Sequence, residues 1–223
     1  MLVYPNMILL DLACPQTVFS IFGAEIHLVG KDASPVRTDV GIPVTPTTTL
    51  ADCPTDLDLL FVPGGLGGTV ALMDDDDVLG FLAARGANAG YVTSVCTGSL
   101  LLGAAGLLRG YHATSHWYVR DLLSLMGATV QADRVVADRN RVTAGGVTAG
   151  MDFALQVVAT LGDEEAARRI QLLLEYDPKP PFDAGSPGAA GQALADDVRQ
   201  RRGSVLETAR QAALRARDRL GPG

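Results

Sequence analysis

The sequence predicts an α/β fold in which a mostly parallel sheet is flanked by helices and followed by a C-terminal helical extension. Short apolar runs rich in β-branched residues alternate with helical stretches, which is the pattern of a parallel sheet covered on both faces. The 223 residues are 48% hydrophobic with a mean hydropathy of +0.21, so the chain has enough apolar residues to bury a large core. These values exclude a disordered protein.

Charge and composition divide the chain near residue 187. Residues 1–186 carry 21 acidic and 11 basic side chains and are expected to form one α/β domain. Residues 187–223 carry 4 acidic and 7 basic side chains and are expected to form a C-terminal helical extension after a proline-rich connector. Because the body is acidic and the arginines of the tail are interleaved with acids, we expect a solvated helix face and no nucleic-acid binding.

Local composition predicts the elements of the first part of the chain. Residues 1–4 are apolar and β-prone and are expected to end a strand. Residues 11–15 resemble a helix entry with a proline near the first turn, and residues 24–29 read as the next strand. The Thr, Pro and Val content of 31–49 predicts irregular or edge-strand structure. The continuous apolar run at 58–62 predicts a central strand buried on both faces, which ends at a glycine-rich turn.

The rest of the chain continues the alternation. Four acids at 74–77 favour the positive end of a helix at 78–84 rather than a metal site. A β-branched strand at 91–95 runs directly into a small apolar helix at 98–108. The remaining predictions are a strand at 111–114, a helix at 116–126, two short strands or a hairpin at 135–142, helices at 151–161 and 163–176, and one long helix at 190–220. The apolar residues of that last helix recur at helical spacing, so it is expected to pack on the body or on a second subunit.

Cys96 is the first candidate for chemistry, because it stands at the junction of a buried strand and a helix. There the free backbone N–H groups of the helix are expected to stabilise a thiolate and lower the pKa of the thiol. The small residues Gly98 and Ser99 allow the sharp turn of a nucleophile elbow. The alternative is a buried, inert cysteine, and the spacing alone does not decide between the two.

Asp11 and a glycine-rich turn complete the candidate site. Asp11 is expected where the first loop enters the first helix, at the strand ends that line the ligand crevice of an open parallel sheet, and its alternative role is a helix cap. The turn at 63–68 is placed to aim backbone N–H groups, such as those of Gly65 and Leu66, at a developing negative charge. It lacks the common nucleotide-binding patterns.

The other cysteines and the histidines give no strong signal. Cys14 and Cys53 form no CxxC pair with Cys96, which argues against a disulfide framework and against zinc. His112 and His116 lie four residues apart but need not share a face, and a third ligand is missing. No apolar run reaches the roughly 18 residues of a membrane span, and the chain starts without a secretory signal pattern, so we expect a soluble, cytoplasmic protein without a metal.

Five motifs together resemble the ThiJ/PfpI superfamily (class I glutamine amidotransferase-like), and within it most closely the isonitrile hydratases. The likeness extends over residues 1–187, and the motifs are YVTSVCTGS at 91–99, FVPGG at 61–65, ATSHW at 113–117, TAGGVTAGMDF at 143–153 and QLLLEYDP at 171–178. It implies a flavodoxin-like three-layer sandwich and a cytosolic homodimer that adds water to an isonitrile with a cysteine nucleophile and no cofactor. Protease-like relatives carry a histidine after the cysteine, where this chain has Thr97.

The resemblance assigns roles to individual residues. Cys96 matches the nucleophile, Asp11 the acidic partner and Thr97 the neighbouring threonine. We expect the Cys96 thiolate to attack the isonitrile carbon while a protonated Asp11 supplies the proton, which gives a thioimidate. Thr97 is expected to hydrogen-bond Asp11 or to order the water, and the N–H groups of Gly65 and Leu66 are expected to stabilise charge.

Two other functions remain open from the sequence. The elbow motif is shared with the sensor domains of AraC-type regulators, although the tail offers one helix rather than a helix-turn-helix pair. Some members of the superfamily act on methylglyoxal as carbonyl-stress enzymes, and these glyoxalase-like relatives usually have a glutamate where Asp11 stands.

Overall fold

A computed structural model describes residues 1–221 and has a four-stranded sheet at its centre. The strand order is β5 (Leu59–Val62), β6 (Tyr91–Val95), β10 (Arg141–Ala144) and β9 (Val135–Asp138). The first three are parallel and β9 is antiparallel to β10, with Thr93 between Phe61 and Val142 in the register. Residues of β5, β6 and β10 are buried almost without interruption, as expected for strands covered on both faces.

Short strands extend this sheet beyond β5. The Leu2 N–H donates to the Phe61 carbonyl at 2.9 Å, and Leu2 forms a parallel bridge with Val29. Val29 belongs to β1 (Val29–Gly30), which pairs with β4 (Thr48–Thr49). Two further pairs join β2 (Val36–Arg37) to β3 (Pro43–Val44) and β7 (His112–Ala113) to β8 (Thr129–Val130). Residues 1–4 therefore contribute to the sheet. Of the strand expected at 24–29, only Val29 is in strand conformation.

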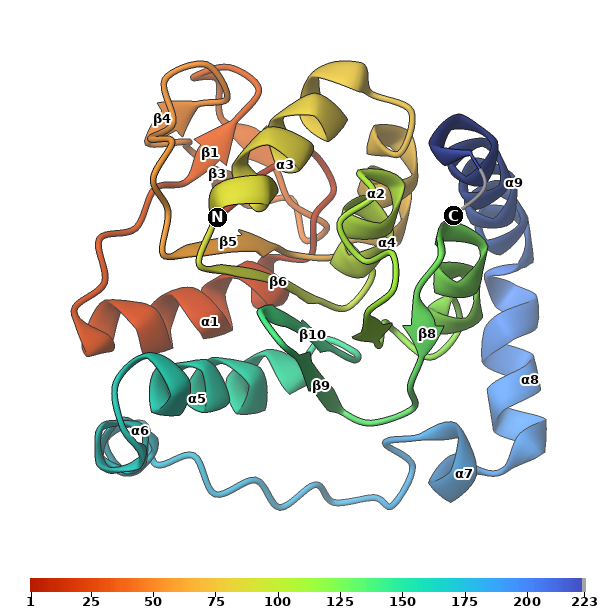
Figure 1. The fold of residues 1–223 in the computed structure, drawn as a ribbon. Helices are drawn as coiled ribbons and strands as arrows, with labels where there is room; N and C mark the ends of the chain where they lie inside the picture. Colours follow the sequence, from red (N-terminus) through yellow and green to blue (C-terminus); the bar gives the residue numbers. More distant parts are fainter. Residues whose placement is uncertain (222–223) are drawn as a thin grey trace.

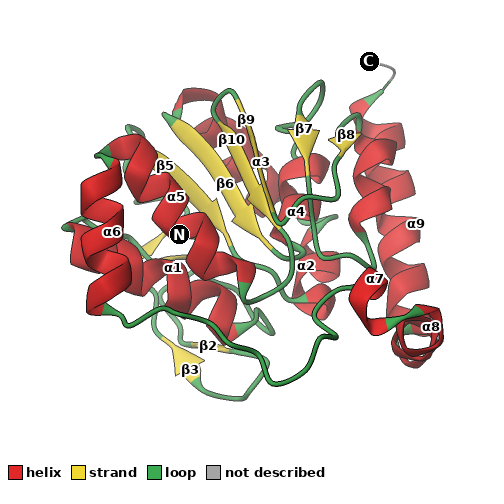
Figure 2. Ribbon diagram, turned by 90° about the horizontal axis from the view of Figure 1, so that it is seen from below, coloured by secondary structure: helices red, strands yellow, loops and turns green. Residues whose placement is uncertain are grey.

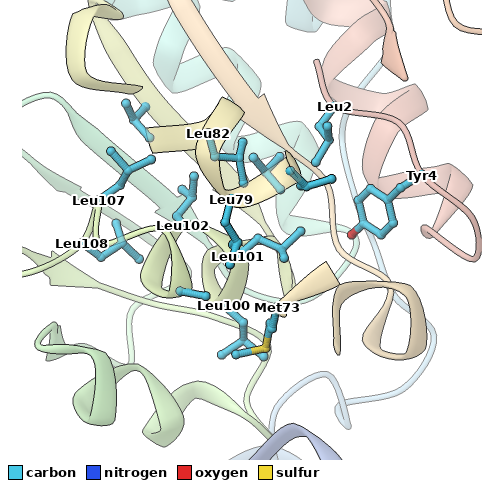
Figure 3. Close-up of a cluster of buried hydrophobic side chains, with 14 of the residues drawn as sticks. Leu2, Tyr4, Met73, Leu79, Leu82, Leu100, Leu101, Leu102, Leu107 and Leu108 are labelled. Carbon is cyan, nitrogen blue, oxygen red and sulfur yellow. The ribbon is translucent and has the colours of Figure 1, made fainter. Parts of the chain in front are cut away.

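Helices cover both faces of the sheet (Figure 1). One face carries α1 (Leu9–Phe22), α5 (Ala149–Leu161) and α6 (Glu164–Leu173), which enclose a core around Phe61 and Phe153. The other face carries α2 (Leu66–Leu72), α3 (Asp76–Asn88), α4 (Gly98–Ala104) and the 3-10 helix η1 (Arg120–Met126). The core on that side is rich in leucine, and its members come from segments far apart in the sequence, such as Leu2, Leu82 and Leu101 (Figure 3). The three-layer α/β sandwich expected from the sequence is confirmed.

The C-terminal helices pack on the body of the same chain (Figure 2). They are α7 (Pro187–Ala190), α8 (Gln192–Arg201) and α9 (Gly203–Leu220). α9 lies against α2, α4 and η1, and its contact stripe is fully buried and consists of small residues, which let two helices approach closely: Ala209, Ala212, Ala213 and Ala216. Asp74 anchors its end through Arg215 at 2.6 Å and Arg219 at 3.4 Å.

Two expected helices and one expected turn differ from the structure. The long helix at 190–220 is broken at Gly191, with φ +83°, and again at Arg202, whose N–H turns back to the Arg199 carbonyl. The helix at 116–126 begins only at Arg120, because His116 is held by the strand end before it. The glycine-rich turn at 63–68 continues into α2, where burial of Leu66 and Val70 outweighs the poor helix propensity of glycine.

In the described part of the chain, every helix is too short or too polar to cross a bilayer.

Candidate active site

Cys96 occupies a strained turn between β6 and α4. Its φ is +57°, in the left-handed region that costs a non-glycine residue on the order of 1–3 kcal/mol. The Cys96 N–H donates to the Gly145 carbonyl at 2.8 Å, and its carbonyl accepts from the Ser115 hydroxyl at 2.9 Å and the His116 N–H at 3.2 Å. These bonds from two neighbouring segments hold the turn, so the direction of the thiol is fixed by the fold.

The Cys96 sulfur is fully buried and its pKa is raised well above that of a free thiol. Burial is the main cause, and the neighbouring charge of Asp11 adds to it. The backbone N–H groups of Thr97 and Val147 act on the sulfur and lower the pKa, but less strongly. The expectation of a thiol with a lowered pKa is therefore wrong, because the position at the helix start also removes the sulfur from water.

Asp11 lies in the first turn of α1 and reaches across to the elbow. Its Oδ2 accepts the Gly64 N–H at 2.9 Å, and the carboxylate lies beside the Cys96 side chain, close enough for each group to shift the pKa of the other. Oδ1 is buried and has no hydrogen-bond partner among the described residues. Because the side chain binds another loop instead of its own helix, Asp11 is not a helix cap.

Burial raises the pKa of Asp11 to about 7, although the hydrogen bonds from Gly64 and Cys96 oppose this shift. Each of the two groups shifts the pKa of the other, so they titrate as a pair. Near neutral pH the thiol keeps its proton, because its pKa is well above that of a free thiol, and the carboxyl takes up a second proton as the pH falls through about 7. A nucleophile and a proton carrier are thus in direct contact.

The Thr97 hydroxyl points away from this pair into a chain of hydrogen bonds. It accepts the Gly65 N–H at 2.9 Å and lies 2.8 Å from the Thr69 hydroxyl, which lies 3.0 Å from the Tyr4 hydroxyl. Tyr4, labelled in Figure 3, donates to the Pro63 carbonyl at 2.7 Å. Since Tyr4 uses its proton there, Thr69 donates to Tyr4 and Thr97 donates to Thr69.

These hydrogen bonds change two expectations about the site. The Thr97 proton is committed to Thr69 and is not donated to Asp11, so Thr97 meets the reacting pair through its backbone N–H. The Gly65 N–H is committed to Thr97 and is not free to stabilise a substrate charge. The Leu66 N–H stands in the first turn of α2, where helical geometry supplies no acceptor.

Gly64 is the point at which the three loops of the site meet. A Cβ added there would lie 2.6 Å from the Thr97 nitrogen, 2.7 Å from Asp11 Oδ2 and 2.7 Å from the Cys96 Cβ. Side chains do not make contacts this short, so only glycine fits while the thiol and the carboxyl stay in place.

His112 and His116 have different partners. His112 Nδ1 lies 3.2 Å from the Asp138 carboxylate at the surface. The His116 ring stacks on Tyr118 with ring centroids 3.7 Å apart, and burial lowers its pKa to about 4, so it is neutral at pH 7. Among residues 1–221, no group of three His, Cys, Asp or Glu side chains is arranged to hold a metal ion.

Partly exposed residues surround the buried pair on one side. His116, Trp117 and Tyr118 follow the bond from His116 to the Cys96 carbonyl, and residues 145–147 follow β10. Burial is the main cause that raises the pKa of Tyr118 to about 12, and the charge of Cys96 adds to it. These two segments border the buried pair on its partly exposed side.

Sequence reasoning missed the Val147 N–H and the Tyr4–Thr69 chain. Val147 stands in the motif at 143–153, but nothing in its type marks a backbone donor. A cavity of about 460 Å³ lies elsewhere, at the amino end of β5, and none of the elbow residues line it.

Comparison with known proteins adds independent information. The family model described as the DJ-1/PfpI family matches residues 1–160. Isonitrile hydratase from Pseudomonas putida is 47% identical over 220 residues, which cover 98% of this chain and 96% of that protein. The crystal structure of a ThiJ/PfpI family protein from Pseudomonas syringae matches with a TM-score of 0.93 and 49% identity, over 96% of this chain and 88% of that one.

A longer protein also matches part of this chain. The HTH-type transcriptional regulator GbdR from Pseudomonas aeruginosa is 29% identical over 153 residues, which cover 68% of this chain and 41% of the regulator. The resemblance inferred from the motifs is confirmed by the full-length matches.

Proposed function

We propose that this chain, which belongs to the DJ-1/PfpI family, is an isonitrile hydratase that converts R–N≡C and water into an N-substituted formamide. The observation that carries the proposal is the buried Cys96 thiol, which lies beside a carboxyl whose pKa is about 7. The reaction needs this combination, because the terminal carbon of an isonitrile must receive both a nucleophile and a proton.

In the first step the thiol adds across the isonitrile carbon. The sulfur forms a bond to that carbon as its proton moves to Asp11, and Asp11 passes the proton to the same carbon. The product is a thioimidate, R–N=CH–S–Cys96. The unpartnered Oδ1 of Asp11 is the oxygen available to carry the proton, since Oδ2 is occupied by Gly64. Negative charge on the sulfur is stabilised by the N–H groups of Thr97 and Val147.

In the second step water releases the product. The Asp11 carboxylate accepts a proton from the attacking water, and the oxygen bonds to the thioimidate carbon. The carbon–sulfur bond then breaks, the nitrogen takes up a proton, and R–NH–CHO leaves while Cys96 recovers its thiol proton. Gly64 and Thr97 act as positioning residues in both steps, and the Leu66 N–H is a further donor for charge that develops on the substrate.

The test is turnover of a simple aryl isonitrile, with formamide followed by absorbance. Wild type is expected to produce formamide, and Cys96→Ala is expected to lose at least about 10³-fold in rate. Acid quenching of wild type during turnover should show the mass of one R–N=CH group on the peptide that contains Cys96. Cys53→Ser is the matched control, because Cys53 is a free cysteine at the cavity beside the amino end of β5, which none of the elbow residues line.

Full activity in Cys96→Ala would overturn the proposal. Consumption of methylglyoxal without isonitrile turnover would favour the carbonyl-stress enzyme instead, and tight ligand binding without any turnover would favour a sensor.

We also propose that the protein is a cytoplasmic homodimer. α9 packs on the body of its own chain, and the most exposed large apolar side chains are on α6 and the connector, where Leu172 is 82%, Leu173 69% and Phe182 78% exposed. Three free cysteines suit a reducing compartment. Light scattering is expected to give twice the mass of the 23.3 kDa chain, and a monomer that keeps full activity would contradict this.

A further inference from the structure

The turn between β10 and α5, residues 145–148, carries one of the hydrogen bonds that hold Cys96 in its strained conformation. The Gly145 carbonyl accepts the Cys96 N–H at 2.8 Å, and the Ala144 carbonyl shares the same N–H at 3.1 Å. Because the φ of Cys96 is +57°, this residue keeps its conformation only while its surroundings hold it there. The position of the turn therefore bears directly on the direction of the thiol.

Core packing gives this turn little support. Each of its four residues is half-buried or exposed, two of them are glycines, and Val147 is its member that packs against the apolar core. Two internal bonds lead into α5: the Ala149 N–H donates to the Gly146 carbonyl at 2.7 Å, and the Gly150 N–H donates to the Val147 carbonyl at 3.2 Å. These bonds shape the turn, but they do not fix its place relative to the sheet.

Arg134 binds the turn through both its backbone and its side chain. It directly precedes β9, and α5 starts beside β9 and β10 (Figure 1). The Arg134 carbonyl accepts the Gly145 N–H at 2.9 Å, and its guanidinium donates to the Thr148 hydroxyl at 3.2 Å. Both ends of the turn are thus bound to one residue, whose own position is set by the pairing of β9 with β10.

Asp152 and Tyr176 orient the Arg134 guanidinium. Asp152 lies in the first turn of α5 and accepts a hydrogen bond from Arg134 Nε at 2.6 Å. The Tyr176 hydroxyl, from the end of α6, donates to the other Asp152 oxygen at 3.1 Å. The Arg134 side chain is 53% exposed and that of Asp152 35%, so solvent screens the pair and its direct contribution to stability is small. Its main consequence is the direction in which the guanidinium meets Thr148.

We propose that Arg134 and Asp152 are positioning residues for the reaction, because they hold the 145–148 turn where the Gly145 carbonyl binds the Cys96 N–H. The inference rests on the proposed function. Without the guanidinium the turn is free to move away from the elbow, and the thiol then spends less time in the direction needed for attack. The chemical step should slow, whereas substrate binding, which does not require an aligned sulfur, should change little.

The experiment measures kcat and KM for an aryl isonitrile in wild type and in variants of the pair. Arg134→Met removes both hydrogen bonds of the guanidinium, so kcat should fall about tenfold while KM stays within about twofold. Arg134→Lys keeps the charge for Asp152 but lacks the planar fork that reaches two acceptors, so it should recover part of the loss. Asp152→Asn should lower kcat about threefold in wild type and add little to Arg134→Met, because the two residues act as one unit.

Arg139→Met is the matched control. Arg139 stands at the other end of β9, is exposed to a similar extent, and is paired with Asp138 at 3.1 Å. It also donates to the Gly110 carbonyl at 2.7 Å and lies 3.5 Å from the centre of the Tyr111 ring. Arg139→Met should therefore lower the unfolding temperature at least as much as Arg134→Met and leave kcat unchanged, which separates positioning from stability.

A second readout needs no substrate. The amide proton of Cys96 resonates at lower field while its hydrogen bond to Gly145 is short, so its NMR signal should move upfield in Arg134→Met and stay in place in Arg139→Met. An unchanged Cys96 signal, an unchanged kcat or a loss confined to KM would each overturn the inference while isonitrile turnover by wild type still supported the function. If wild type converted no isonitrile, the proposed function would be overturned, and the NMR comparison alone would still support or overturn the hold of Arg134 on the turn.

Discussion

The elbow and the C-terminal extension are stabilised in opposite ways. At the elbow, every polar atom around Cys96 and Thr97 is buried, and the backbone of Cys96 is strained. In the extension, the arginines are exposed, the ion pairs lie in water, and α9 is held mainly by a stripe of alanines. Burial makes each elbow contact expensive to remove, whereas solvent screens the contacts of the extension. Substitutions in the two regions should therefore differ in size and in kind.

The largest effect is expected for Asp11→Asn. The amide keeps the acceptor for the Gly64 N–H but cannot carry the thiol proton, so kcat/KM should fall about 10²- to 10⁴-fold. In wild type, kcat/KM should fall as the pH drops through about 7, because a second proton then fills the pair. This acidic limb is expected to disappear from the residual activity of the variant. An unchanged limb would assign the titration to another group.

The same variant should be more stable than wild type at pH 8. The pKa of Asp11 rises from 3.8 in the unfolded chain to about 7 in the folded one, so folding binds the proton. Its contribution to stability is full below pH 3.8 and is lost as the pH rises through 7, which costs on the order of 4 kcal/mol at pH 8. Urea unfolding of both proteins at pH 5 and pH 8 measures the effect, and equal differences at the two pH values would contradict it.

The next effect is expected from two glycines that lie close together in the sequence, Gly64 in the loop after β5 and Gly67 in α2. Gly64→Ala places a methyl group among Asp11, Cys96 and Thr97, and should lower kcat/KM by roughly tenfold to a hundredfold and stability by about 1–3 kcal/mol. Gly67→Ala has open space around the new Cβ and lies inside α2, so it should add about 0.5–1 kcal/mol of stability. Kinetics and thermal unfolding check both, and similar results for the two variants would show that the loop rearranges freely.

A smaller effect on rate is expected for Thr97→Val. The variant removes the acceptor for the Gly65 N–H and the partner of the Thr69 hydroxyl, so stability should fall by about 2 kcal/mol. The backbone N–H of residue 97 still reaches the sulfur, so kcat/KM should stay within about tenfold of wild type. Thr97→Ser keeps the hydroxyl and should restore the stability. A thousandfold rate loss with unchanged stability would give the hydroxyl a direct chemical role.

The sequence predicted the parts of the site that depend on local pattern. A β-branched strand that ends at Cys96 and small residues after it were enough to predict the elbow turn, and the apolar run at 58–62 predicted a central strand. Contacts between distant segments were not predictable. The hydrogen bonds of the Thr97 hydroxyl with the Gly65 N–H and with Thr69, and that of Thr69 with Tyr4, join residues that lie far apart in the sequence. The same holds for the pKa of Cys96, which depends on how completely the fold removes the sulfur from water. The break at Arg202 was hidden in a stretch whose arginines favour a helix.

The smallest effect is expected in the extension, from Asp74→Asn. The carboxylate pairs with Arg215 and Arg219, and the hydrogen bond from Arg215 lowers its pKa, so the pairs contribute above pH 3.8 and are lost as the pH falls below it. Because all three side chains are partly exposed, the loss should be about 0.5–1 kcal/mol and should shrink in high salt. Asp183→Asn, in the exposed connector, is the control and should change nothing. If Asp74→Asn instead lowered kcat/KM as strongly as Gly64→Ala, the docking of α9 would be coupled to the elbow through α2 and α4, and the two regions could no longer be treated as independent.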